Sequence, residues 1–186
     1  EMALLKQPVF PEALVSRALL LKQRGDYPGA IAALRRAIEQ NPLFVEAHAH
    51  LSAMLHELGQ VDAAIIAYRG LLQLRPEDAR SHNNLASLLL ERGQAAEALG
   101  HLDQALSLDP RYAKAMNNRG SACKALGRNV EAEACFRKAI ELDPTLVAAY
   151  NNVGTSVGSQ GRGEESHEVV PTFCSEKSGQ RLPRLL

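Results

Sequence analysis

The chain has 186 residues, and its 21 basic residues balance its 21 acidic ones, so the formal net charge at neutral pH is zero. Nucleic acids and anionic membranes attract proteins through excess positive charge, and this composition therefore argues against both kinds of partner. Aromatic residues make up only 4% of the sequence and Trp is absent, which favours a core of small and aliphatic side chains packed helix on helix.

A period of 34 residues runs along most of the chain. Three residue types recur at this interval. They are the prolines Pro42, Pro76, Pro110 and Pro144, the glycines Gly25, Gly59, Gly93, Gly127 and Gly161, and the alanines Ala30, Ala64, Ala98 and Ala132. Three features in fixed register over four periods indicate an internal repeat. With the proline numbered as position 32, the full units are 11–44, 45–78, 79–112 and 113–146.

In chain order, the first predicted element is the end of a truncated preceding repeat over 1–10, because Pro8 lies 34 residues before Pro42. The four full units follow. Residues 147–161 match the first helix of a partial fifth unit. The composition then becomes polar and aperiodic, and Pro171 falls where a second helix would continue. We therefore predict a flexible tail over 162–186.

Each full unit predicts two antiparallel helices, as the third unit illustrates. Apolar residues at helical spacing precede Gly93, a residue type that favours the position just after a helix because it tolerates positive φ. Apolar residues at helical spacing resume at Ala98 and stop at Asp109-Pro110, since proline cannot continue the helical hydrogen-bond ladder.

Small residues also recur at position 8, in the middle of each first helix. They are Ala18, Ser52, Ala86, Gly120 and Gly154. Such residues let two helix axes approach closely. One hairpin cannot bury both of its faces, whereas stacked copies can, so the repeat predicts an all-α superhelical α-solenoid. Apolar helix faces left at the two ends of the array predict possible self-association through those ends.

The spacing resembles the tetratricopeptide repeat (TPR) family, whose pattern has small and apolar residues at fixed positions and a proline near the end of each unit. The second unit carries Leu51, Ala64, Tyr68 and Pro76 at these positions, while no unit has Trp at the position where the family often does. The resemblance covers residues 11–146. It implies a right-handed superhelix of TPR helix hairpins, with the first helix of each unit lining a concave groove.

The resemblance also places positions 2, 5, 6 and 9 of each first helix on the groove. From the third unit on, these positions and their surroundings carry amides, hydroxyls and cations. The candidate groove residues are Arg80, Asn83, Asn84, Ser87, Lys114, Asn117, Asn118, Ser121, Lys124, Asn151 and Asn152. A carboxamide both donates and accepts hydrogen bonds, so the Asn row could pair with an extended peptide backbone. Two alternatives stay open: inheritance from a duplicated ancestor, and packing of the position-5 Asn against the neighbouring helix.

Two groups within the family sharpen this expectation. The row formed by Asn84, Asn118 and Asn152 resembles the asparagine ladder of the repeat domain of O-linked N-acetylglucosamine transferase, which grips substrate peptide backbones. The first two units depart from that row. Chaperone-binding repeats use a carboxylate clamp, which would need Lys and Asn where this chain has Ala49 and Ala53. Recognition of that clamp type is therefore not expected.

The sequence contains no phosphate-binding loop, nucleophile elbow, zinc-protease helix or calcium loop. His48 and His82 fall in the aromatic core register, and His50 and His56 fall toward the groove, so no metal site is expected. Three cysteines without a CxxC pair predict neither a disulfide framework nor a thiolate metal site, and they favour a reducing compartment such as the cytoplasm. No apolar run approaches the roughly 18 residues of a membrane-spanning helix.

The sequence as a whole predicts a non-catalytic, cofactor-free protein–protein interaction module that binds a partner peptide in the concave groove. Arg80, Lys114 and Lys124 favour a partner with an acidic segment. Two alternatives stay open. The chain could be the substrate-recruiting TPR segment of a larger enzyme such as a glycosyltransferase, or it could be a self-assembling scaffold.

Overall fold

The computed structural model describes residues 10–159, in which every regular element is an α-helix. The helices are α1 (Pro11–Gln23), α2 (Tyr27–Gln40), α3 (Val45–Glu57), α4 (Val61–Leu74), α5 (Ala79–Glu91), α6 (Ala95–Leu108), α7 (Ala113–Ala125), α8 (Asn129–Leu142) and α9 (Val147–Ser159). Each full predicted unit thus contains two helices. The tail predicted over 162–186 and nearly all of the preceding repeat predicted over 1–10 lie outside the described residues.

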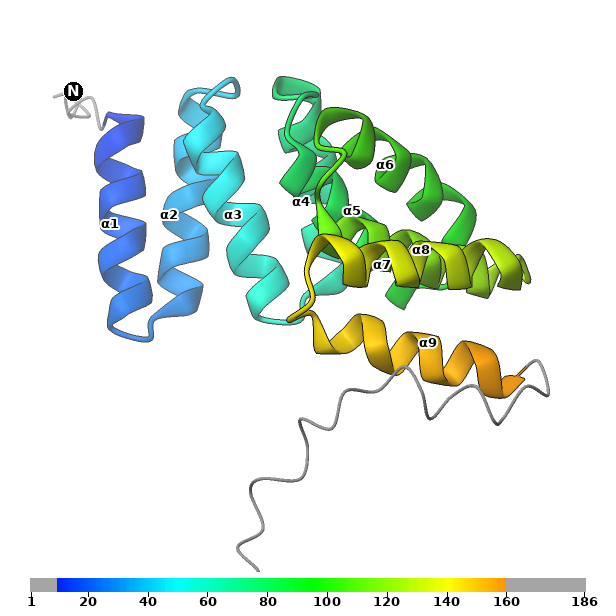
Figure 1. The fold of residues 1–186 in the computed structure, drawn as a ribbon. Coiled ribbons are helices and arrows are strands. Elements are labelled where there is room, and N and C mark those ends of the chain that lie inside the picture. The colour runs from blue at the N-terminus through cyan, green and yellow to red at the C-terminus, as the bar shows by residue number, and fades with distance from the viewer. Residues whose placement is uncertain (1–9, 160–186) are drawn as a thin grey trace, which may run out of the picture.

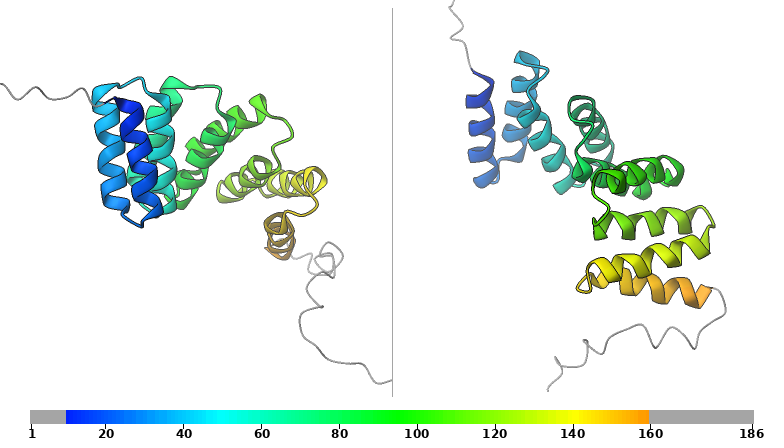
Figure 2. Two further views of the ribbon diagram at one scale, coloured as in Figure 1. Left: turned by 90° about the vertical axis from the view of Figure 1, so that its left-hand side faces the viewer. Right: turned by 45° about the horizontal axis from the view of Figure 1, so that its top comes forward.

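The helices form hairpins that stack in chain order (Figure 1). Each helix contacts the next one in the chain, and three of the four pairs of successive first helices also contact each other, namely α1 with α3, α5 with α7 and α7 with α9. The helix direction turns progressively from α1 to α9, so the array coils (Figure 2). This arrangement confirms the predicted α-solenoid. Within the described range, no helix has both the length and the apolar character needed to cross a membrane.

The turn inside each hairpin is set by a glycine in the left-handed region. Gly25, Gly59, Gly93 and Gly127 have φ between 66° and 78°. In the first hairpin, the amide of Gly25 donates to the carbonyl of Lys22 at 3.0 Å and the amide of Asp26 donates to that of Leu21 at 2.9 Å. This pair of bonds is a Schellman motif, and it satisfies carbonyls at the end of the helix that would otherwise lack partners. The sequence prediction for these glycines is confirmed.

The connection between units is fixed by the residue in the family's Trp position. His48 and His82 each place Nε2 against the carbonyl of the proline six residues earlier, at 2.9 and 3.0 Å. The hydroxyl of Tyr150 donates to the carbonyl of Pro144 at 3.2 Å. Because a carbonyl only accepts, the histidine nitrogens must be the donors. These side chains therefore tie the first helix of a unit to the loop that precedes it.

Small residues pack where the two helices of a hairpin approach. Ala18, Ser52 and Ala86 at position 8 have no exposed surface, and the recurrent alanines of the second helices are equally buried. Gly120 takes the same position in α7, opposite the ring of Phe136. A Cβ at Gly120 would lie 2.5 Å from that ring, so the observed position of the Phe136 ring requires that position 8 of this hairpin has no side chain.

Candidate functional site

The predicted groove residues lie along the first helices of three successive units. We call the surface formed by positions 2, 5, 6 and 9 of α5, α7 and α9 the amide stripe. Burial divides them into three groups. Arg80, Lys114 and Asn151 are exposed, Asn84, Ser87, Asn118, Ser121, Lys124 and Asn152 are half-buried, and Asn83 and Asn117 are buried. The stripe is thus a surface with a buried amide layer beneath it.

The asparagines pair with one another across the units. The Nδ2 of Asn118 donates to Oδ1 of Asn83 at 2.9 Å, and the Nδ2 of Asn152 donates to Oδ1 of Asn117 at 2.9 Å. Each bond joins position 6 of one first helix to position 5 of the previous one. The buried position-5 asparagines therefore hold neighbouring units together, which is the packing role that the sequence left open. Asn151 is exposed, and no bond of this kind is formed by it within the described residues.

The position-6 asparagines keep part of their hydrogen-bonding capacity. Asn118 uses one N–H toward Asn83 and accepts a long bond of 3.4 Å from Asn117. A carboxamide has two N–H donors and two acceptor sites, so one donor and one acceptor of Asn118 are still available at the half-buried surface. The ladder also fixes the orientation of these amides before any ligand arrives.

The first member of the row has a different partner. The Nδ2 of Asn84 donates to the hydroxyl of Tyr68 on α4 at 3.1 Å. Burial raises the pKa of the Tyr68 hydroxyl above its ordinary value, and the hydrogen bond with Asn84 partly offsets that rise. Tyr68 therefore stays a neutral phenol at physiological pH and anchors the end of the amide row to the second unit.

Two predicted cations meet at one pocket. Arg80, Asn84 and Lys114 line a cavity of about 640 Å³ between successive units. Arg111 and Tyr112 join them there, although the sequence analysis missed both because they lie in the loop before α7 rather than on a helix stripe. Burial raises the pKa of the Tyr112 hydroxyl, while the charge of Arg80 acts in the opposite direction.

Asp143 also lines this pocket, and it accepts hydrogen bonds from a turn of the chain, as do the neighbouring carboxylates. Asp78 accepts the backbone amides of Arg80 and Ser81 as the N-cap of α5. Asp109 and Asp143 each accept the amide two residues later, and the hydrogen bonds from Thr145 hold the pKa of Asp143 below its usual range. In the described part of the chain, the cations of the pocket form no ion pair within 4.0 Å.

Lys124 does not belong to this pocket. Its Nζ donates to Oγ1 of Thr155 on α9 at 3.0 Å, further along the stripe. Ser121 is turned toward its own helix, since its hydroxyl donates to the carbonyl of Asn117. The predicted cation set thus divides into a pocket formed with Arg80 and Lys114 and a separate position at Lys124.

The structure also brings together side chains that the sequence analysis left apart. Nδ1 of His82 lies 3.0 Å from Nδ1 of His101, a residue not considered among the candidate histidines. The guanidinium of Arg119 donates to Asp103 at 2.8 Å and to Sγ of Cys135 at 3.1 Å. Over residues 10–159, no group of three metal-ligating side chains is placed to hold an ion.

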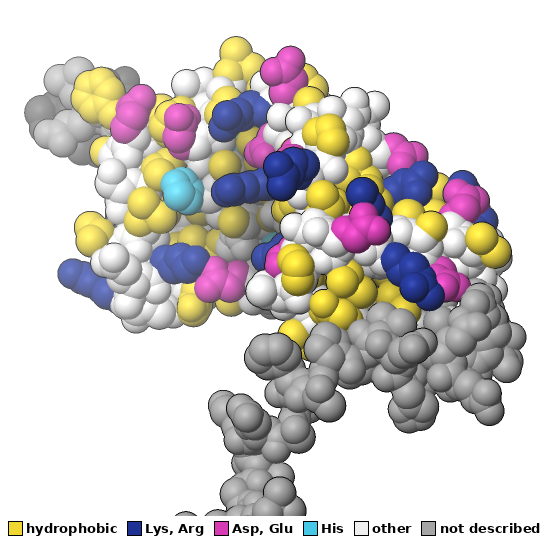
Figure 3. Space-filling model, viewed as in Figure 1, with side chains coloured by type: hydrophobic (Ala, Val, Ile, Leu, Met, Phe, Trp, Pro, Cys, Tyr) yellow, Lys and Arg dark blue, Asp and Glu magenta, His cyan; other side chains and the backbone are white. Residues whose placement is uncertain are grey.

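On the face of the molecule shown in Figure 3, basic and acidic side chains alternate with hydrophobic ones and no single sign of charge dominates. This distribution agrees with the zero formal charge of the whole sequence. A surface of mixed sign lacks the extended positive field by which proteins attract nucleic acids.

Comparison with known families gives one result. The sequence profile of the family described as tetratricopeptide repeat matches residues 15–79 and 83–146. These two ranges cover more than half of the chain and span all four full units. No curated protein sequence matches the chain at a significant level.

Several solved structures share the fold. MamA from Desulfovibrio magneticus RS-1 superposes with a TM-score of 0.80 at 19% identity, over 86% of this chain and 90% of that one. YrrB, described as a TPR protein with an unusual peptide-binding site, has a TM-score of 0.73 at 21% identity, over 84% and 81% of the two chains. A thermophilic TPR protein of Thermus thermophilus has a TM-score of 0.62 at 25% identity, over 86% and 87%.

Proposed function

The chain belongs to the tetratricopeptide repeat family, and from that premise we propose that it is a non-catalytic interaction module whose amide stripe binds an extended, acidic peptide of a partner protein. Repeats of this family are protein-interaction modules, so the interaction role follows from membership. The peptide, its position and its acidic character are the proposal.

The observation that carries the proposal is the ordered amide row beside a pocket whose cations Arg80, Arg111 and Lys114 outnumber its one lining carboxylate, Asp143. The position-6 asparagines are fixed by bonds to the preceding unit and still have a donor and an acceptor each for a ligand. An extended peptide backbone offers the complementary acceptors and donors at regular intervals. Preorganised amides lose little conformational entropy when they bind, which favours affinity without strong side-chain selectivity.

The cationic pocket supplies the preference for acidic ligands. Arg80, Arg111 and Lys114 share one cavity, and the nearby carboxylates are held by backbone amides of their own turns. A guanidinium recognises a carboxylate through two parallel hydrogen bonds. An acidic side chain of the peptide, placed over this pocket while its backbone follows the amide stripe, would gain both kinds of contact.

The proposal is tested with a random linear peptide library displayed on phage and selected against the full chain. Peptides recovered from the selection are synthesised, labelled and titrated by fluorescence anisotropy. The test variant is Arg80→Glu/Lys114→Glu, which changes two exposed side chains. The matched control is Arg24→Glu/Arg36→Glu, which makes the same change of charge at two exposed arginines outside the pocket.

We expect the recovered peptides to be enriched in Asp and Glu and to lose about tenfold in affinity with the test variant, but not with the control. Affinities that fall equally with both variants would indicate a general charge effect. Affinities that fall with neither would contradict the placement of the acidic residue over this pocket.

A further inference from the structure

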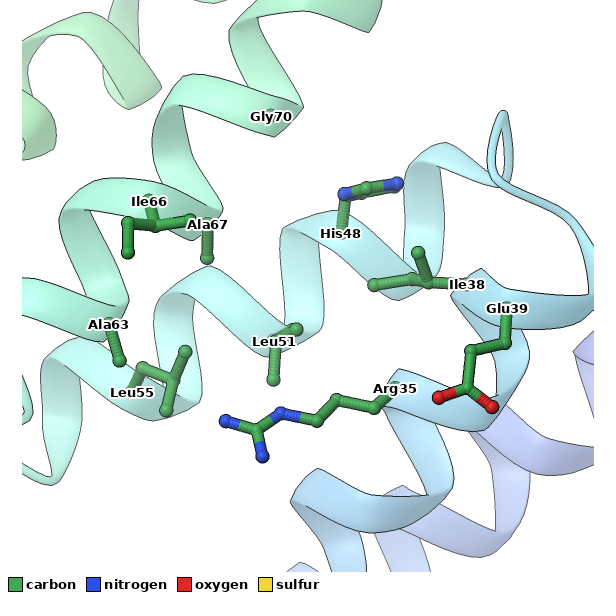
Figure 4. A pocket seen from close by; sticks show the side chains of 10 residues that line it. All are labelled: Arg35, Ile38, Glu39, His48, Leu51, Leu55, Ala63, Ile66, Ala67 and Gly70. Atoms are coloured by element: carbon green, nitrogen blue, oxygen red, sulfur yellow. The ribbon is translucent and has the colours of Figure 1, made fainter.

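A second cavity lies between α2, α3 and α4, and we call it the α2–α4 crevice (Figure 4). Its volume is about 460 Å³. Leu51 and Leu55 of α3 form its floor, Ile38 and Ile66 stand on either side, and the guanidinium of Arg35 extends over the floor (Figure 4). Ile66 is 70% exposed, so an isoleucine at the mouth of an apolar cavity faces solvent.

The crevice lies on the opposite side of the array from the amide stripe. The floor and the nearby His48 come from positions 4, 7 and 11 of a first helix, whereas the stripe comes from positions 2, 5, 6 and 9. At about 100° per residue, these two sets point in opposite directions from the helix axis. A ligand in the crevice would therefore contact none of the residues of the proposed peptide groove.

We call the place where the second helix of one unit meets the two helices of the next unit a junction. The crevice lies at the first junction, and the corresponding junction one unit later, between α4, α5 and α6, is filled. One repeat later, Arg69 takes the register of Arg35, and its guanidinium pairs with Glu97 of α6 at 2.7 Å. His101, also from α6, fills the space above the floor and meets His82 at 3.0 Å. At the α4–α6 junction, the Glu97 carboxylate thus neutralises Arg69, and the His101 ring occupies the space that is open in the crevice.

The third junction is also neutralised, with the charges exchanged. Asp103 takes the register of Arg35 and pairs with Arg119 at 2.8 Å, and Arg119 stands in the register of the floor residue Leu51. Arg119 further contacts Cys135, which takes the register of Ala67. In both later junctions, the charged residue of the second helix therefore has a partner within the chain.

The first junction lacks both closing groups. Ala63 and Ala67 stand in the registers of Glu97 and His101, and Gly70 widens the same wall. Among the described residues, Arg35 forms no ion pair within 4.0 Å, although Glu39, one turn further along the same helix, also lines the crevice. The α2–α4 crevice is therefore a largely apolar site whose guanidinium has no ion pair, and α4 supplies neither the carboxylate nor the ring that α6 supplies one unit later.

We propose that the α2–α4 crevice is a second docking site, which receives a partner protein's peptide segment carrying an aliphatic side chain and a carboxylate. The aliphatic side chain fills the space over Leu51 and Leu55 beside Ile66, and the carboxylate pairs with Arg35. The chain's own α4–α6 junction is the template for this occupant, because there Glu97 supplies the carboxylate and the His101 ring fills the second position. In the crevice that second position is lined by Leu51, Leu55 and Ile66, which suits an aliphatic side chain. A cavity of this size accommodates one anchoring side chain and its neighbours.

The experiment uses a closed variant, Ala63→Glu/Ala67→His, which copies the filled junction into the crevice. The displayed peptide library is selected on the wild-type chain in the presence of excess soluble closed variant, so that peptides for other surfaces are removed. Recovered peptides are titrated against wild type, the closed variant, Arg35→Glu and the groove variant Arg80→Glu/Lys114→Glu. Arg35 is exposed and unpaired, so its reversal leaves the fold intact even if the closed variant is less stable.

Methyl-labelled isoleucine provides a positional readout. The chain has only five isoleucines, and two of them, Ile38 and Ile66, line the crevice. We expect the recovered peptides to combine an aliphatic residue with an acidic one and to shift these two methyl signals. Their affinity should fall about tenfold with Arg35→Glu and be unchanged in the groove variant. Binding to Arg35→Glu should recover when the acidic residue of the peptide is exchanged for Lys.

Four results would overturn the proposal: no peptide recovered, peptides that bind the closed variant equally well, peptides indifferent to Arg35→Glu, or shifts confined to isoleucines outside the crevice. Sedimentation of the wild type and of the closed variant tests whether a second copy of the chain, rather than a partner's peptide, occupies the crevice. Self-association of the wild type that is abolished by Ala63→Glu/Ala67→His would make a second copy of the chain the occupant instead. Failure of peptide binding at the amide stripe leaves these results unaffected, because the groove variant is measured separately.

Discussion

Gly120 and Phe136 pack so closely that a side chain at position 120 would displace the ring from its observed position. A Cβ built at Gly120 would lie 2.5, 2.7 and 3.0 Å from three carbons of the Phe136 ring. Ordinary carbon–carbon contacts are about 3.5–4.0 Å, so the ring would have to move by about 1 Å. Phe136 has no exposed surface, and the ring therefore cannot move into solvent.

We therefore expect Gly120→Ala to destabilise the protein although it improves helix propensity. Ala in a helix interior is favoured over Gly by about 1 kcal/mol, whereas overpacking of a buried site costs about 1–3 kcal/mol. The net change in the free energy of unfolding should be a loss of about 1 kcal/mol. Gly100 in α6 is the control, because nothing lies within 4 Å of its Cβ position, and Gly100→Ala should raise stability by up to about 1 kcal/mol.

The measurement is urea denaturation followed by far-ultraviolet circular dichroism, with the slopes compared because repeat arrays can unfold in segments. A double-mutant cycle with Phe136→Leu gives the decisive comparison. Two other hairpins of the chain combine Ala at position 8 with Leu at the register of Phe136, namely Ala18 with Leu34 and Ala86 with Leu102. In the Leu background, Gly120→Ala should therefore become stabilising. If it already stabilises the wild type as much as Gly100→Ala does, the steric reasoning is wrong.

Three further predictions concern hydrogen bonds and protonation. Burial, with a smaller effect of His82, lowers the pKa of His101, so the unfolded chain binds more protons as pH falls below about 7, and stability should decline toward about pH 5. Urea midpoints across this range should show the decline, and His101→Gln should reduce it; an unchanged slope would contradict the assignment. Asn117→Ala, which removes the buried acceptor of Asn152, should cost about 1 kcal/mol more than Asn151→Ala at the exposed equivalent position; equal costs in urea denaturation would mean that the ladder adds no stability. The Asp26 carboxylate caps α2 through the amide of Gly29, so Asp26→Ala should lower the unfolding free energy by about 1 kcal/mol in the same assay, and Asp26→Asn, which retains an acceptor oxygen, should recover most of it.

The sequence predicted those features that depend on residues close together in the chain. The left-handed glycines, the helix ends before each proline and the small residues between helices follow from backbone and side-chain properties of single repeats. The period then fixes the solenoid, because identical hairpins can bury their faces only by stacking. These predictions needed no knowledge of how one unit is rotated relative to the next.

Contacts between units depend on that rotation, and the sequence left only one of them open as an alternative, the packing of the position-5 Asn against the neighbouring helix. The Asn bonds join residues 35 positions apart, one more than the repeat, because position 6 of one helix meets position 5 of the previous one. A signal was present, since asparagines occupied both positions in successive units. Arg111 was not predicted because it lies in a loop rather than on a helix stripe, and the ion pair between Arg119 and Asp103 joins a first helix to the second helix of the previous unit. The assignment of the amide stripe as a binding surface stays a prediction.

The two proposed sites use the same repeat in different ways, and this difference makes them separable. On the amide stripe, bonds between units fix the ligand-binding groups, so sequence similarity between units creates the site. At the α2–α4 crevice, the site exists because the first junction departs from the other two: Ala63 and Ala67 leave unfilled a position that Glu97 and His101 fill one unit later. Arg80 and Arg35 lie on opposite sides of the array, and each can be reversed alone. If both sites bind independently, the affinity losses of Arg35→Glu and Arg80→Glu/Lys114→Glu should each affect one class of peptide. If one peptide responds to both variants, the two faces must be coupled through α3 and α4, which line the crevice, and α5, which carries Arg80.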